Sequence, residues 1–286
     1  MNQPIIIIGM HRSGTSMLTR TLQDGGLFMG KYREKNDESL YFLEINNWIL
    51  KQTNATWDNP YCYSFNNRKF KEAIKRVFRT RSKFFAYRYL GWKNYFKYRT
   101  LDNIDFKWGW KDPRNSFTID IWKEIYPHAK IIHIYRNPVD VANSLKVRAE
   151  KWESNFQNNI FKRLREVFLK GKINYTHSYR VLSLEEGYKL WKEYTLNCLN
   201  VDNALHIKYE DLLSSPKKHL KEIFSFINLD VSDKELEMYE GNFDISRKYA
   251  FADKDNLLDF YSSIKHDQIM KTLSYDKLDE CYERSL

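Results

Sequence analysis

The sequence predicts an α/β protein in which helices flank a central parallel sheet in three layers. Two short runs of mostly β-branched residues, at 5–8 and 130–135, have the length and composition of buried strands. Each run is followed by a helical pattern, and strands that alternate with helices favour a parallel sheet. Ligands of such sheets bind beyond the carboxyl ends of the strands, so we expect the functional residues there.

Length and composition fit one domain. The chain has 286 residues, and 42% of them are hydrophobic, which is enough for a sizeable core. We therefore expect residues 1–286 to form a single domain, with 57–105 as a mostly helical insertion. Three widely spaced cysteines predict neither a disulfide framework nor a metal site. Because the sequence shows no secretory signal and no apolar stretch of about 20 residues, we expect a cytoplasmic protein.

The elements follow in order along the chain. The first strand leads into a helix over 14–24, which Gly25 and Gly26 should end. After the 130–135 strand, Asn137 is a candidate N-cap and Pro138 suits the first turn of a helix. The other expected elements are helices over 38–54, 116–126, 155–170, 184–200 and 217–228, and strands over 106–110 and 205–209.

The insertion carries the positive charge of the chain, whose formal net charge is +10. Residues 68–99 contain twelve Lys and Arg residues and a single acid, Glu72, and aromatic residues are interleaved with them. Such a stretch can bind an anionic polymer, a nucleic acid or a membrane surface. A solvated face of a helical insertion, with its aromatic rings packed on the core, is the alternative.

The segment between the first strand and the first helix has the form of a phosphate-binding loop. Gly9 and Gly14 are separated by four residues, and Thr15 and Ser16 open the helix. In this layout backbone N–H groups and a helix N-terminus can face an anion. A P-loop nucleoside-triphosphatase carries lysine at the position of Thr15, whereas the cation here is Arg12. A strand–turn–helix corner that binds nothing is the alternative.

A second candidate anion site follows the 130–135 strand. Arg136 comes directly after the strand, and Ser144 lies about two helical turns further on. Arg148 lies four residues after Ser144 and therefore on the same face of the helix. Guanidinium and hydroxyl groups suit a phosphate dianion. For Arg136 alone, an ion pair with Asp140 is the alternative.

Four segments, in this order, resemble those of sulfotransferases that use 3′-phosphoadenosine 5′-phosphosulfate (PAPS). The pattern Gly-x-x-Arg-Ser-Gly-Thr-Ser at 9–16 resembles their 5′-phosphosulfate loop, and Arg136-x7-Ser144 resembles their 3′-phosphate motif. Trp-Lys-Asp-Pro at 110–113 resembles a segment of the tyrosylprotein branch, and 207–216 resembles the strand and turn that follow. The pattern is most similar to bacterial sulfotransferases of the Arg-Ser-Gly-Thr type. The C-terminal Arg-Lys-Gly segment of the cytosolic small-molecule branch is absent, and Arg247-Lys248 is a poor substitute for it.

The resemblance implies a P-loop-like fold and an enzyme of the EC 2.8.2 type that uses PAPS and releases 3′,5′-ADP. Sulfuryl transfer to a hydroxyl resembles phosphoryl transfer, with in-line displacement and charge growing on the leaving oxygen. Arg12 lies where it can stabilise that charge, and the resemblance makes Lys111 a second cation, so no metal is required. For Lys111 the alternative is a structural ion pair with Asp112 or another acid. The residues that the resemblance assigns to the cofactor are Arg12, Ser13, Gly14, Thr15, Ser16, Arg136, Ser144, Arg148 and Tyr209.

The acceptor hydroxyl needs a general base within hydrogen-bonding reach. Glu38 is the first candidate, because residues 36–42 resemble the acidic segment that follows the loop helix in these bacterial enzymes. Glu44 is the second candidate. His11 is a third residue of suitable chemistry, although its place in the loop favours packing or substrate contact, and His133 is expected in the core.

The acceptor itself stays open among a glycan, which can be anionic, a peptide tyrosine and a lipid-linked sugar. No specific nucleic acid is expected, and peripheral contact with a membrane is left open. Two other functions compete with the sulfotransferase: a P-loop kinase that uses ATP and Mg²⁺, and a non-enzymatic protein that binds polyanions. Thr15 in place of the lysine and the pair of Arg136 and Ser144 argue against the kinase.

Overall fold

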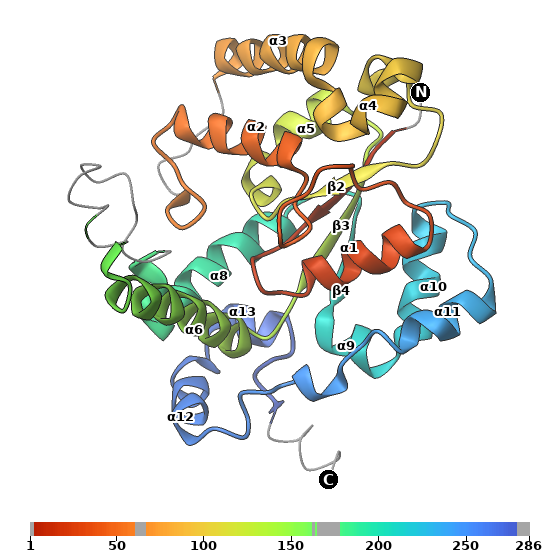
Figure 1. The fold of residues 1–286 in the computed structure, drawn as a ribbon. Coiled ribbons are helices and arrows are strands. Elements are labelled where there is room, and N and C mark those ends of the chain that lie inside the picture. Colours follow the sequence, from red (N-terminus) through yellow and green to blue (C-terminus); the bar gives the residue numbers. More distant parts are fainter. Residues whose placement is uncertain (1–2, 61–66, 162–163, 165–177, 279–286) are drawn as a thin grey trace. The chain divides into compact units, whose positions relative to one another are not determined.

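A computed structural model describes residues 3–60, 67–161, 164 and 178–278 (Figure 1). The chain divides into two compact units. The first comprises Met1–Tyr135 and Tyr194–Ile245, and the second comprises Arg136–Glu193 and Ser246–Leu286. Each is described by itself, and whether the two form one domain stays a prediction.

A four-stranded sheet is the centre of the first unit. Its strands are β1 (Ile5–Ile8), β2 (Gly109–Lys111), β3 (Lys130–Tyr135) and β4 (Ala204–Lys208). They run parallel in the order β2-β1-β3-β4. Ile5 is in register with Gly109 on one side and with Lys130 on the other. The predicted parallel sheet is therefore confirmed, although the strand expected over 106–110 is shorter.

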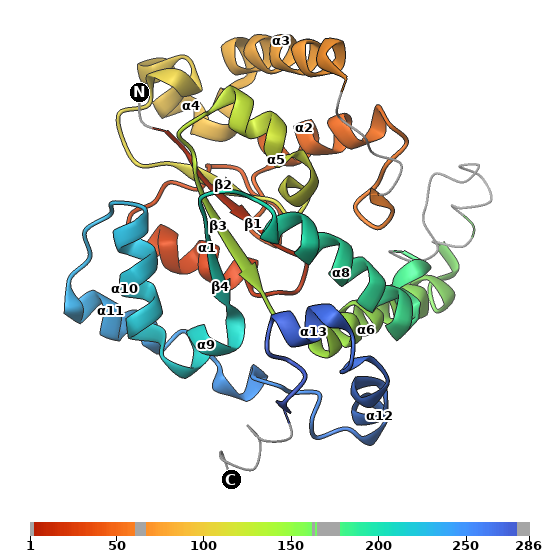
Figure 2. The same cartoon turned by 180° about the vertical axis from the view of Figure 1, so that it is seen from behind.

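Alternate residues of β1 face two separate cores, because successive side chains of a strand point to opposite faces. Ile6 and Ile8 pack with α2 (Leu40–Lys51), α3 (Arg68–Phe85), α4 (Tyr87–Tyr98) and α5 (Asn115–Ile125). Ile5 and Ile7 pack with α1 (Thr15–Asp24), α9 (Tyr209–Ser214), α10 (Pro216–Phe226) and α11 (Asp233–Glu240). Figure 2 shows these two groups of helices on opposite faces of the sheet. The three predicted layers are present.

The insertion is helical, as predicted, and most of its described residues lie in α3 and α4. It joins the body through aromatic packing: Phe78 of α3 contacts Phe42, Trp122 and Tyr126. The ring of Phe42 in turn stacks on Trp110 of β2, with centroids 3.8 Å apart. The short helix η2 (Leu101–Asn103) then leads back towards the sheet.

The described part of the second unit is helical. The longest of its described elements, α6 (Pro138–Gln157), begins as predicted: the Asn137 side chain accepts hydrogen bonds from the N–H groups of Val139 and Asp140. The boundary predicted at 155 is wrong, because α6 continues unbroken to Gln157, and most of 158–170 lies outside the described residues. The other described elements are η3 (Arg180–Leu182), the first part of α8 (Leu184–Leu199), η4 (Ile245–Arg247, which begins on the last residue of the first unit), α12 (Asp255–Ile264) and α13 (Gln268–Thr272).

One polar contact lies within the sheet of the first unit. His133 of β3 is fully buried, and its Nδ1 atom lies 2.9 Å from Nδ1 of His206, the residue opposite on β4. The expectation of a core histidine is confirmed. Of the three cysteines, Cys198 is buried with a free thiol, and Cys62 and Cys281 lie outside the described residues.

Candidate active site

The loop between β1 and α1 requires glycine at both ends. Gly9 has a φ of +134°, and a Cβ atom there would lie 2.2 Å from the carbonyl oxygen of Ile134. Gly14 has a φ of +91°, and its Cβ would lie 2.4 Å from the ring of Tyr209. Between them, Arg12 also adopts a positive φ of +71° and has an exposed side chain. The backbone thus turns sharply enough for α1 to begin directly beside the end of β1.

The N-terminus of α1 is suited to an anion. No side chain caps it, and no acidic residue lies in its first turn. The N–H groups of a first turn have no partner within the helix and carry a partial positive charge. Ser13, directly before Gly14, is fully buried, and its Oγ atom has no hydrogen-bond partner among the described residues. Since buried hydroxyls are normally paired, this donor and the helix end together fit a phosphate group.

The backbone carbonyl of Asn36 brings together three of the predicted residues. It accepts a hydrogen bond of 2.6 Å from the hydroxyl of Ser16 on α1 and another of 2.6 Å from Nζ of Lys111 on β2. Lys111 also lies 3.3 Å from Oε1 of Glu38. The loop helix, Lys111 and Glu38 are therefore connected by three short contacts within the first unit.

Glu38 lies between two cations. Its other oxygen lies 3.4 Å from Nη1 of Arg114, which also binds Asp112 at 2.9 Å. The side chains of Lys111, Glu38 and Asp112 are almost completely buried, and that of Arg114 is 11% exposed. Lys111 therefore pairs with Glu38, and Asp112, its expected alternative partner, pairs with Arg114. Burial of a charge is costly unless it is paired, and here each carboxylate has a cation.

Asn46 of α2 supports this cluster from the core. Its amide nitrogen donates to Asp112 at 2.9 Å and to Asn115 at 2.8 Å. Its amide oxygen accepts from Thr118 at 2.9 Å and from the indole of Trp122 at 3.0 Å. Both donors and both acceptor positions of the amide are thereby used, which fixes its orientation. Asp112 is consequently held on two sides, and through it Arg114 is held as well.

The surroundings of Glu38 favour proton transfer. Burial raises the pKa of its carboxyl group, and the positive charge of Lys111 opposes that rise. A carboxylate whose pKa lies closer to neutrality is a stronger general base than an exposed one. Perturbed groups of this kind cluster at functional sites.

The two other candidate bases have different surroundings. Glu44 binds Arg88 at 2.6 Å and Arg81 at 3.1 Å, and both of these cations belong to the insertion. The imidazole of His11 is mostly buried, and its ring meets that of Trp57 edge-on at 4.9 Å. Glu44 thus joins the insertion to α2, and His11 packs against Trp57, which is one of the two roles expected for it.

The second unit contains Arg136, Ser144 and Arg148. Arg136 is mostly buried, pairs with Asp140 at 3.2 Å and donates to the backbone carbonyl of Arg247 at 2.7 Å. Ser144 and Arg148 lie one turn apart on α6 and are both partly exposed. The ion pair with Asp140 is therefore present, and the segment that includes Arg247 is held against Arg136.

The sequence alone did not single out Arg114 and Asn46. Arg114 follows directly after the Lys111-Asp112-Pro113 motif, so its position was a usable signal. Asn46 has no such signal, because its role depends on contacts with residues 66 to 76 positions away. Tyr209, expected at the cofactor, is the residue whose ring lies against Gly14.

A family comparison decides the class of protein. A model of the sulfotransferase family matches residues 4–233. The chain belongs to the sulfotransferase family. The enzyme is therefore a transferase of the class that takes PAPS as its sulfuryl donor, as the sequence motifs predicted. The matched range contains every residue predicted for the site.

Solved structures of sulfotransferases are similar to the enzyme. A sulfotransferase domain from the curacin biosynthetic pathway is 14% identical, with 93% of this chain and 99% of that chain covered and a TM-score of 0.48. The sulfotransferase domain of the Synechococcus PCC 7002 olefin synthase is 19% identical, with 92% of this chain and 88% of that chain covered and a TM-score of 0.44. Mouse sulfotransferase SULT7A1, complexed with PAP, is 18% identical, with 88% of this chain and 66% of that chain covered and a TM-score of 0.37. No curated protein matches the chain.

Two features are absent from the part of the chain that the structure describes. None of the described helices is both long and apolar enough to cross a membrane. Within the same residues, no three His, Cys, Asp or Glu side chains are grouped so that they could hold a metal ion.

Substitution of two glycines tests the close contact in the loop. Gly14 and Gly26 both have a positive φ, but no atom lies within 4 Å of a Cβ at Gly26. Gly26→Ala should therefore lower the free energy of unfolding by about 1–2 kcal/mol through backbone strain alone. Gly14→Ala should lower it by about 1–3 kcal/mol more, because the methyl group meets Tyr209. Urea unfolding of both variants measures the difference, and equal losses would show that the Tyr209 contact is unimportant.

Proposed function

We propose that the enzyme transfers the sulfuryl group of PAPS to a hydroxyl of its acceptor by in-line displacement, with Glu38 as the general base. The observation that carries this proposal is the buried pair of Glu38 and Lys111, 3.3 Å apart, joined to the loop helix through the carbonyl of Asn36. A base and a cation beside an anion-binding helix end are the groups that such a transfer needs. When bound, PAPS supplies the sulfuryl group and is left as 3′,5′-ADP.

Different residues of the chain bind the two ends of the cofactor and stabilise the developing charge. The 5′-phosphosulfate is bound by the N-terminus of α1 and the residues around it, which are Ser13, Gly14, Thr15 and Ser16. The buried hydroxyl of Ser13 is one of the donors. Arg136, Ser144 and Arg148 bind the 3′-phosphate, and Tyr209 lies with the cofactor. Arg12 and Lys111 stabilise the charge that develops on the leaving oxygen, so the reaction needs no metal.

Lys111 and Arg114 also position the base. Each contacts a different oxygen of Glu38, so the carboxylate cannot rotate freely. A carboxylate has about four acceptor positions, which leaves capacity for the proton of the acceptor hydroxyl. The acceptor class stays open among a glycan, anionic or neutral, a peptide tyrosine and a lipid-linked sugar.

One experiment tests the function and identifies the acceptor class. The enzyme is incubated with labelled PAPS, EDTA and extracted glycans, peptides or lipids, and sulfated products are identified by mass spectrometry. We expect a labelled product in the presence of EDTA. Phosphorylation that requires both ATP and Mg²⁺, with no sulfated product, would instead support a P-loop kinase.

The two candidate anion sites predict a nucleotide preference. 3′,5′-ADP should protect the enzyme from thermal unfolding better than 5′-AMP, since each hydrogen bond from a charged group contributes about 1.5–3 kcal/mol. Arg136→Ala should remove most of this preference and Arg136→Lys only part of it. Lys146→Ala, a change on the same helix, should keep it. Full discrimination by Arg136→Ala would exclude this arginine from the 3′-phosphate.

Substitution of the base should separate chemistry from cofactor binding. Glu38→Gln keeps the size of the side chain and should lower turnover about 10²–10⁴-fold, with the affinity for 3′,5′-ADP nearly unchanged. Arg12→Ala should weaken both turnover and cofactor affinity. Glu44→Gln is the control with near-normal turnover. Rate measurements give the turnover of each variant, and nucleotide titrations give its affinity for 3′,5′-ADP. If Glu44→Gln lost turnover and Glu38→Gln kept it, Glu44 would be the base.

The pH dependence of turnover should report the surroundings of Glu38. A base acts in its ionised form, so turnover should fall as the pH drops through the raised pKa of Glu38, at a higher pH than for an exposed glutamate. The charge of Arg114 lowers that pKa, so Arg114→Met should move the acid limb to still higher pH. A loss of rate that is equal at every pH would mean that Arg114 has only a structural role.

A further inference from the structure

The outer surface of the insertion carries a connected group of exposed aromatic rings on α3 and α4. Trp92 stacks on Tyr87, with ring centroids 4.4 Å apart and planes at 11°. Phe85 lies 6.4 Å from Tyr87, and Phe96 lies 6.1 Å from Trp92. The exposed fractions of Phe85, Trp92 and Phe96 are 43%, 54% and 62%. We call Phe85, Tyr87, Trp92, Tyr95 and Phe96 the ring cluster.

A break in α4 creates this cluster. Gly91 has φ and ψ of +72° and 162°, so α4 consists of two helical pieces joined at a kink. In a continuous helix, residues five positions apart point about 140° away from each other. The kink therefore allows Tyr87 and Trp92 to stack, and it turns the rings into one exposed group.

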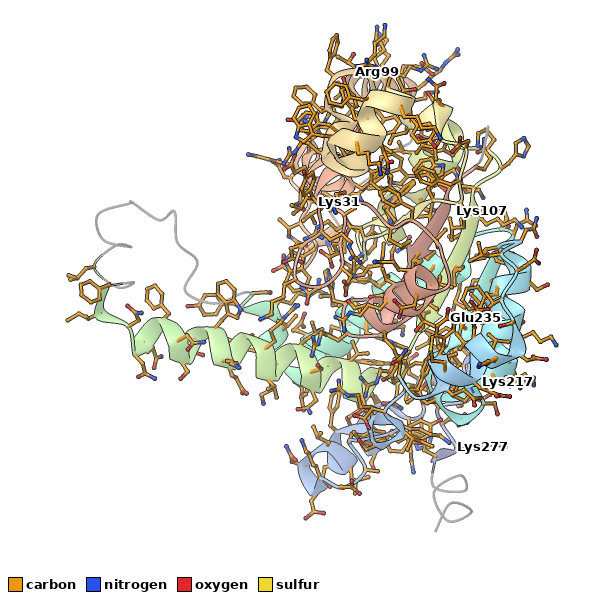
Figure 3. All side chains as sticks on the ribbon, turned by 45° about the vertical axis from the view of Figure 1, so that its right-hand side comes forward. Lys31, Arg99, Lys107, Lys217, Glu235 and Lys277 are labelled. Atoms are coloured by element: carbon orange, nitrogen blue, oxygen red, sulfur yellow. The ribbon has the colours of Figure 1, made fainter. Side chains whose placement is uncertain are left out.

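Two arginines lie against rings of the cluster, and further cations are exposed on α3. The guanidinium of Arg81 lies 5.6 Å from the ring of Phe85, and that of Arg99 lies 5.4 Å from the ring of Phe96. Figure 3 shows Arg99 at the outer edge of the insertion. Arg76, Arg79 and Lys83 follow one exposed stripe of α3, at helical spacings of three and four residues.

The positive charge of this surface is not cancelled locally. Several cations of the insertion bind acids of the body: Lys71 and Lys75 bind Glu124, and Arg81 and Arg88 bind Glu44. No ion pair of the described residues includes Arg76, Arg79, Lys83, Lys93 or Arg99. One set of cations thus holds the insertion in place, and another set is exposed to solvent on α3 and α4 and at Arg99.

We propose that this surface binds an anionic lipid bilayer. Exposed Trp and Phe side chains insert at the boundary between headgroups and acyl chains, and Lys and Arg side chains are attracted to anionic headgroups. The two features coincide here within one pair of helices.

The ring geometry favours a bilayer over a single-stranded nucleic acid. Proteins that bind nucleic acids by stacking present the open faces of their rings to the bases. In the ring cluster the face of Trp92 lies against Tyr87, and Tyr95 meets Tyr87 edge-on, with centroids 6.0 Å apart. Ring faces engaged with one another are less available to bases, whereas exposed ring edges suit acyl chains.

Vesicle flotation tests the proposal with matched variants. The full-length enzyme should float with phosphatidylglycerol/phosphatidylcholine vesicles and not with pure phosphatidylcholine. Removal of three cations in Arg76→Gln/Arg79→Gln/Lys83→Gln should weaken binding roughly 100-fold. Lys218→Gln/Lys221→Gln/Lys234→Gln removes the same charge from another exposed surface and should have little effect. Equal losses in the two triple variants would mean attraction by net charge alone and would overturn the proposal.

Two further comparisons test the rings. Trp92→Ser/Phe96→Ser should abolish flotation, whereas Met238→Ser/Ile245→Ser, a pair with 66% exposure at each site, should not. Brominated lipids should quench the fluorescence of Trp92, so part of the quenching should be lost in Trp92→Phe. The control is Trp152→Phe, which changes a tryptophan that is 51% exposed and should keep that quenching. Tight binding of a single-stranded oligonucleotide without vesicle binding would overturn the proposal in favour of a nucleic acid. None of these outcomes affects the assignment of Glu38, which is tested by turnover.

Discussion

The buried carboxylate of Glu38, between Lys111 and Arg114, is the constraint on which the site depends. Charged groups lose their hydration when they are buried, and the loss is tolerable only if each finds a partner of opposite sign. In this cluster two carboxylates face two cations, so none of the four can be removed without leaving a buried charge uncompensated. Such a loss typically costs 3–5 kcal/mol. The residues that we propose for the chemistry are thus also residues that the fold cannot easily lose.

The sheet explains why these groups meet. β1 and β2 are parallel neighbours in register, so the loop after Ile8 and the side chain of Lys111 emerge at the same edge. The segment between α1 and α2 then crosses that edge, and the carbonyl of Asn36 contacts both Ser16 and Lys111. A backbone carbonyl as the connecting group leaves the side chain of residue 36 unconstrained by this contact.

The sequence predicted those parts of the molecule that local patterns determine. The runs at 5–8 and 130–135 became inner strands, and the Gly9 to Ser16 spacing became a loop that only glycine can form at both ends. The same patterns could not reveal the partners of Glu38, since its contact with Arg114 joins residues 76 positions apart. Nor could they separate Glu38 from Glu44. Both are acids near the start of the same helix. Glu44 forms ion pairs with two arginines of the insertion only because the folded chain brings the insertion against α2.

The histidine pair between β3 and β4 has a consequence for the enzyme in acid. With Nδ1 atoms 2.9 Å apart, one ring donates the proton on that nitrogen and the other accepts it, so the accepting ring is neutral. Burial lowers the pKa of both histidines, which favours the neutral form of each. Burial, and then the neighbouring His206, lower the pKa of His133 to about 3, whereas a histidine of the unfolded chain takes up a proton near pH 6.5. Between these two values the unfolded state binds more protons, so the free energy of unfolding declines as the pH falls. The buried histidine pair between the inner strand β3 and the edge strand β4 therefore lowers the stability of the folded enzyme in acid.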